Sequence, residues 1–123
     1  MASGTIKNSE EILLWTNPSP NANFAAQTIS LSLSNYSKVK IVYGRPSSSD
    51  YYREIVVKVG YKTQLTNQWC NINGCGVNTR LTQVTPTSII FNDNYNVEID
   101  KTPRVVPTLV NNMNVPIEIY GIK

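Results

Sequence analysis

A single antiparallel β-sandwich or jelly-roll-like domain of about seven or eight strands is the fold that the sequence predicts. Apolar and polar residues alternate with a period of two, and Asn, Ser, Pro and Gly separate short runs of β-branched and aromatic residues. The 123 residues suit one domain, residues 1–123. Only 15% of them are charged, against roughly 25% in a typical soluble domain. This composition excludes a disordered tail and a coiled coil.

The N-terminal part predicts two strands. Ile12–Trp15 is the first, and Asn17–Asn21 must be a loop because two prolines remove donors of a strand ladder. Thr28–Leu33 alternates strictly and predicts a half-buried strand. Ser9–Glu11 and Asn23–Gln27 are the only hints of helix, a turn or two each.

A hairpin follows. Lys38–Tyr43 places Val39, Ile41 and Tyr43 on one face, and the loop Gly44–Asp50 separates it from a second strand, Tyr52–Tyr61. We expect Tyr43 and Tyr61 to point inward.

Shorter strands complete the chain. Thr79–Val84, Ser88–Phe91, Asn96–Ile99 and Pro116–Ile122 fit the same period. Asn92–Asn94 predicts a tight turn, because Asn tolerates positive φ.

The chain has no histidine, which excludes Ser-His-Asp and Cys-His triads and zinc sites built on His. Glu98 and Asp100 share a strand face, as a glycosidase pair would, or form a solvated face. Asn92–Asn96 resembles part of a calcium loop but lacks its Gly and bidentate Glu. We expect no catalytic residue, no metal and no cofactor.

Cys70 and Cys75 flank an Asn-Gly pair and could close a small disulfide loop or remain two free thiols. A disulfide would imply life outside a reducing cytosol. A metal knuckle would need two more ligands of suitable softness, and the chain has no histidine and no other cysteine.

The net charge of +3 comes from basic residues scattered along the chain, so we expect no nucleic-acid partner. No apolar window is long enough for a membrane span, and we expect no membrane contact. Loops that mix Tyr, Trp, Asn and Arg are typical of recognition surfaces, although aromatics could simply cover the ends of the sandwich. The candidate ligand-binding residues are Arg45, Tyr51, Tyr52, Trp69, Asn71 and Asn73.

Three motifs frame the chain: LWTNPSP (Leu14–Pro20), FAAQT (Phe24–Thr28) and IYGI (Ile119–Ile122). Together they resemble small virion proteins of phages and prophages of gut bacteria. The resemblance implies a structural protein of the virus particle, such as a tail-fibre tip, a baseplate appendage or a head fibre. It implies a homotrimer, other virion proteins as partners, and no catalytic residues to carry over. The Trp69–Gly76 segment is not a part that the resemblance explains.

The combined hypothesis is a non-enzymatic virion appendage that assembles and adheres to a bacterial surface glycan or protein. It would be assembled in the host cytoplasm and then be extracellular. The alternatives are a capsid decoration protein without a receptor, a bacterial carbohydrate-binding adhesin or lectin and, more remotely, a glycan hydrolase. Candidates for the core and subunit contact come from both termini: Ile12, Leu14, Trp15, Ile117, Ile119 and Tyr120.

Overall fold

The computed structural model describes residues 10–45, 48–72, 74–100 and 105–123. Within these ranges the chain forms nine β-strands and no helix. The strands are β1 Glu11–Thr16, β2 Gln27–Ser30, β3 Lys38–Arg45, β4 Ser48–Lys58, β5 Lys62–Asn71, β6 Gly74–Val84, β7 Ser88–Asp100, β8 Val105–Leu109 and β9 Val115–Ile122.

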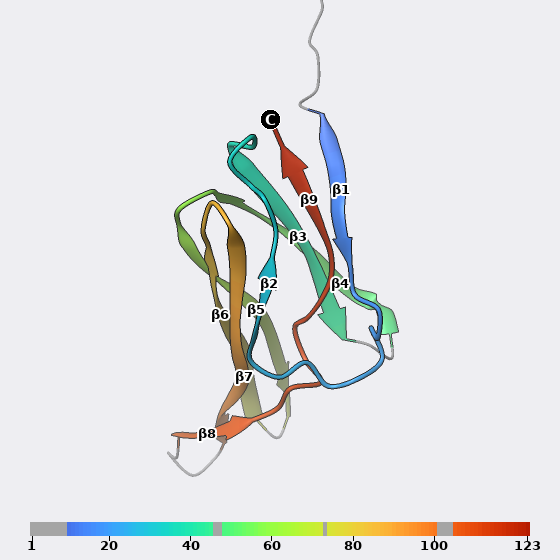
Figure 1. The fold of residues 1–123 in the computed structure, drawn as a ribbon. Coiled ribbons are helices and arrows are strands. Elements are labelled where there is room, and N and C mark those ends of the chain that lie inside the picture. Colours follow the sequence, from blue (N-terminus) through green and yellow to red (C-terminus); the bar gives the residue numbers. More distant parts are fainter. Residues whose placement is uncertain (1–9, 46–47, 73, 101–104) are drawn as a thin grey trace, which may run out of the picture.

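Two antiparallel sheets face each other (Figure 1). The first has the order β1-β9-β3-β4 and the second the order β2-β7-β6-β5. β2 pairs with Ser88–Phe91 of β7, whereas β8 pairs with Tyr95–Ile99 further along the same strand. The predicted β-sandwich is confirmed.

The strands with clear alternation lie where the sequence places them. In the β3–β4 hairpin Val39 is opposite Val57 and Ile41 is opposite Ile55, so one apolar face meets the core. β1 and β9 pair along the first sheet, which confirms a strand near each terminus.

Five details of the prediction are wrong. The predicted loop Gly44–Asp50 is too long, because β3 continues to Arg45 and β4 already begins at Ser48. Asn92–Asn94 is not a turn: β7 runs through it, and a register shift opposite β6, between Arg80 and Thr82, absorbs the extra residue. β5 and β8 were not predicted, because Asn and Pro interrupt their patterns. Tyr61 is 61% exposed because the chain turns at Gly60, whose φ is 99°. Neither helical hint forms a helix in the described ranges, where Glu11 belongs to β1 and Phe24 to a loop.

The core lies between the sheets and is apolar over most of its extent. Phe24 is the aromatic centre of the core. Its ring packs edge-to-face with the rings of Phe91 and Trp15, with ring centroids 5.4 Å and 6.4 Å apart. The buried apolar side chains that pack together in this core are Phe24, Leu33, Val39, Ile41, Tyr43, Val57, Leu65, Val84, Ile89, Phe91, Val115, Ile117 and Ile119.

Arg80 breaks this apolar pattern, because its side chain is 0% exposed. On β6 it shares the inward parity of Thr82 and Val84, so the pleat directs it into the core. Burial lowers the pKa of Arg80 to about 10, and the charge of Asp93 offsets part of this effect. The guanidinium therefore stays charged at neutral pH inside the sandwich.

Four backbone carbonyl oxygens satisfy the Arg80 guanidinium. Nη1 donates to Phe24 O at 2.8 Å and to Asn92 O at 2.7 Å, Nε to Asn114 O at 3.0 Å, and Nη2 to Met113 O at 3.2 Å. The guanidinium carbon also lies 5.3 Å from the centre of the Phe24 ring. The acceptors lie in the β1–β2 loop, in β7 and in the β8–β9 loop.

Buried asparagines extend this hydrogen-bond network. Asn114, held at φ 49°, donates to Asn94 Oδ1 at 2.8 Å, and Asn94 donates to Val110 O at 2.8 Å. The β1–β2 and β8–β9 loops are two of the segments by which the chain crosses between sheets. The network therefore fixes both crossings together.

We predict that Arg80→Met lowers the free energy of unfolding by about 3–5 kcal/mol, because it leaves several buried carbonyls without a donor. Arg53→Met is the matched control, since Arg53 is exposed on β4, and it should change stability by about 0.5 kcal/mol or less. Urea denaturation measures both. An Arg80→Met loss no greater than the Arg53→Met loss would contradict the account.

Candidate functional site

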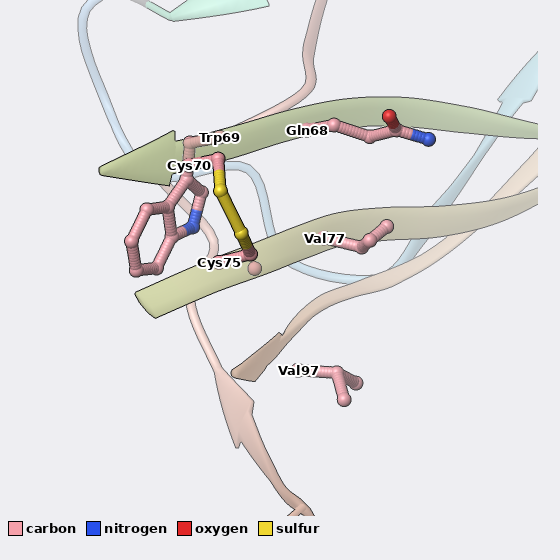
Figure 2. A pocket seen from close by; sticks show the side chains of 7 residues that line it. Gln68, Trp69, Cys70, Cys75, Val77 and Val97 are labelled. Atoms are coloured by element: carbon pink, nitrogen blue, oxygen red, sulfur yellow. A yellow bond between two sulfur atoms is a disulfide. The ribbon is translucent and has the colours of Figure 1, made fainter. Parts of the chain in front are cut away.

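A shallow groove of about 470 Å³ lies at the end of the β5–β6 hairpin. It is lined by Gln68, Trp69, Cys70, Cys75, Gly76, Val77 and Val97. Figure 2 shows the Trp69 indole beside the Cys70–Cys75 disulfide, with Val77 and Val97 following on the next two strands. The lining is mostly apolar and contains no titratable side chain, so the groove offers contact rather than acid–base chemistry.

A disulfide joins Cys70 and Cys75, which selects one of the two alternatives that the sequence left open. The two residues are direct cross-strand partners, with their Cα atoms 4.0 Å apart, and both are exposed. The disulfide therefore ties the second-to-last pair of the hairpin before its turn, followed only by the pair Asn71 and Gly74, and it lines the groove.

The Trp69 indole packs against a glycine of the neighbouring strand β6. Gly76 is its cross-strand partner, and a methyl group on Gly76 would overlap the indole. The absence of a side chain at Gly76 lets the ring lie flat against β6. The indole is partly exposed in this position and is presented by two strands rather than by a loop.

The groove continues into an uncharged strip on the outer face of the second sheet. Val77 pairs with Val97, and Thr79 with Tyr95, which in turn pairs with Leu109 of β8. Residues that are direct cross-strand partners lie on the same face of a sheet. Val77 alternates with the buried residues of β6, so the sheet face that carries Val77 points away from the core. We call this set of residues the outer strip: Val77, Leu81, Tyr95, Val97, Leu109 and the Cys70–Cys75 disulfide.

The outer face of the first sheet is different, because it carries charges. Lys40 donates to Glu11 at 2.8 Å, lies 3.6 Å from Glu54, and sits 4.7 Å from the centre of the Tyr120 ring. The hydrogen bond to Glu11 is the main reason that the pKa of Lys40 is raised. The two outer faces therefore offer different chemistry to a partner.

The structure does not bring the predicted ligand-binding residues together. Arg45 is exposed at the end of β3, and the Tyr52 ring lies against Gly44, so both belong to the first sheet. Trp69 belongs to the second sheet, and among the described residues no ring contact or hydrogen bond links it to Tyr52. Asn73 lies outside the described residues, as do the side chains of Tyr51 and Asn71.

The predicted core and contact residues divide into two groups. Ile119 is 0% and Ile117 9% exposed, which confirms them as core and corrects the predicted subunit contact, because the core of the same chain covers both. Leu14 and Trp15 are partly buried against that core. Tyr120 is half-buried on the outer face of the first sheet and donates to Glu118 Oε1 at 3.0 Å.

The sequence analysis missed Gln68, Val77 and Val97 as residues that line the groove, because it treated the cysteine segment as a loop between strands. One available signal was the parity of β6. Every second residue of β6, counted back from the buried Val84, faces the core, and this series ends at Gly76. Cys75 and Val77 therefore lie on the outer face of the sheet.

No protein-family model, curated protein or solved structure matches the chain. The described part of the chain contains no helix long and apolar enough to cross a membrane.

We predict that reducing the disulfide lowers the free energy of unfolding by about 2 kcal/mol, the value of the chain-entropy model for so short a loop. The sandwich should persist, because its core lies elsewhere. Denaturation with and without a reductant measures the loss, and the Cys70→Ser, Cys75→Ser double variant is the control that should not respond to reductant. Global unfolding on reduction in native buffer would contradict this placement.

Proposed function

We propose that this chain is a non-enzymatic structural module of a bacteriophage particle. It forms a homotrimeric appendage of the tail-fibre, baseplate or head-fibre type, in association with other virion proteins, and adheres to the bacterial surface.

The observation that carries the proposal is the groove beside Trp69. It is lined by Trp69, two valines, an amide and a disulfide, which are groups that bind by contact and hydrogen bonding. The disulfide and Val77 lie on the outer face of the sheet, and the Trp69 indole lies against Gly76, its cross-strand partner. Paired strands and a cross-strand disulfide hold these groups in place, so the surface is preorganised for recognition. An exposed disulfide also suits a protein that works outside a reducing cytosol. The resemblance of the framing motifs to virion proteins is the reason for assigning the chain to a bacteriophage particle.

Immuno-electron microscopy tests particle membership. Gold-labelled antibody raised against this chain should decorate the tail or the capsid of particles purified from the host that carries the coding sequence. Antibody preabsorbed with the pure protein is the control. Bare particles, together with free protein in the lysate, would overturn the proposal.

Adhesion is tested by binding of the purified chain to host cells. Trp69→Ala should weaken binding about fivefold, if the ring contributes about 1 kcal/mol of contact. Tyr61→Ala is the matched control, since Tyr61 is 61% exposed but lies at the β4–β5 turn. Equal binding by Trp69→Ala and Tyr61→Ala would refute the adhesive role while leaving particle membership intact.

A further inference from the structure

The disulfide lies next to the residue pair that positions the Trp69 indole (Figure 2). Trp69 pairs with Gly76 and Cys70 pairs with Cys75, so the two pairs are neighbours in the β5–β6 ladder. The indole lies where a side chain on Gly76 would be, and this contact lasts as long as the two strands stay paired. The disulfide therefore restrains the backbone that carries the indole.

Of the two strands, β5 has less support at this end of the sheet. It is the edge strand of the second sheet, so within the described part of the chain Trp69 and Cys70 pair with β6 alone. In contrast, β6 is paired on both sides, because Gly76 also pairs with Glu98 of β7. Segments with few contacts open locally at a low cost in free energy. Loss of the disulfide would therefore release the end of β5, with Trp69, while β6 stayed in the sheet.

Both cysteines are accessible in the folded protein. They are exposed and belong to the outer strip, on the sheet face that points away from the core. The core contains neither of them, so the sandwich can form while both are thiols. Because the β5–β6 register already places Cys70 opposite Cys75, the disulfide can then form without refolding.

We propose that the Cys70–Cys75 disulfide is a redox switch that prepares the Trp69 groove for binding after the chain has left the reducing cytosol. While both cysteines are thiols, the end of β5 opens and the indole leaves Gly76. Once the disulfide has formed, the groove is held in its binding shape. The inference rests on the proposed function for adhesion and for the passage out of the cytosol, and on the structure for the coupling between the disulfide and Trp69.

Thiol–disulfide exchange with a small-molecule disulfide supplies the oxidation. The thiolate of one cysteine attacks a sulfur of the small disulfide, which forms a mixed disulfide and releases one thiol. The thiolate of the other cysteine then attacks the cysteine sulfur of the mixed disulfide, which forms the Cys70–Cys75 bond and releases the second thiol. The cysteines lose two electrons and two protons in total, and the small disulfide gains them. A dithiol such as dithiothreitol reverses the reaction.

Hydrogen exchange tests the coupling without any host cell. The full chain is measured oxidised and after reduction with dithiothreitol. The protected backbone amides of Gln68–Cys70 should exchange about thirtyfold faster after reduction, the factor that the chain-entropy model gives for so short a loop. The amides of Val97 and Glu98 are the internal reference, because β7 is paired there with both β6 and β8, and their rates should change by less than about twofold. Unchanged exchange at Gln68–Cys70, or an equal acceleration at Val97 and Glu98, would overturn the inference.

Binding to host cells tests the consequence for adhesion. The reduced chain is alkylated and freed of reagents before mixing, so that the disulfides of the cells stay intact. It should bind about fivefold more weakly than the oxidised chain, which is the loss expected for Trp69→Ala. Trp69→Ala itself should not respond to reduction, because it lacks the ring through which the switch acts, whereas Tyr61→Ala should respond as the wild type does. The Cys70→Ser, Cys75→Ser double variant, which carries no alkyl group, should bind weakly with and without reductant.

A double variant that binds as tightly as the oxidised wild type would overturn the inference, as would a Trp69→Ala variant that weakens further on reduction. Oxidised and reduced chains that bind equally, both through Trp69, would leave the proposed function standing without the switch. Faster exchange at Gln68–Cys70 combined with no binding in either redox state would support the coupling and contradict the adhesive role.

Discussion

A charged side chain inside the sandwich sets the main constraint on this fold. Taking a guanidinium out of water is costly unless hydrogen bonds replace its hydration. Arg80 obtains them from backbone carbonyls, such as Phe24 O and Asn114 O, that belong to segments distant in the sequence. Because those carbonyls must converge on one group, the β1–β2 and β8–β9 crossings are fixed relative to β6. The two sheets are thereby joined by polar contacts at this level as well as by apolar packing.

The framing motifs have structural roles in the same sandwich, and one of them supplies a carbonyl to Arg80. Asn17 accepts from Ser19 N at 2.8 Å and donates to Pro116 O at 2.9 Å, which ties the first loop to β9. Phe24 supplies both a core ring and a carbonyl for Arg80. Gly121 lies under the Tyr36 ring, where a side chain would overlap. The motifs therefore take part in the packing of the sandwich, whereas the groove is lined by residues outside them, namely Gln68–Cys70, Cys75–Val77 and Val97.

The sequence predicts β1, β2, β3, β4 and β9, and it predicts the parts of β6 and β7 that lie in Thr79–Val84, Ser88–Phe91 and Asn96–Ile99. It does not predict β5 and β8, because Asn67 and Pro107 look like breaks, although an inward Asn is tolerated beside other asparagines and an edge strand tolerates proline. The burial of Arg80 follows from its parity with Val84, but a typical arginine lies on the surface and the sequence does not reveal the carbonyls that surround this one. Trp69 was identified as a site residue from its type, whereas the residues around it depend on a register that only the fold defines.

The most direct test of the Arg80 constraint is hydrogen exchange of the arginine Nε–H groups, followed by nuclear magnetic resonance at neutral pH. Arg45 and Arg53 are exposed and serve as internal references. If Arg80 is buried and its Nε–H is bound to Asn114 O, its signal should persist under conditions in which the reference signals exchange with solvent. An Arg80 signal that exchanges as fast as those of Arg45 and Arg53 would contradict the account.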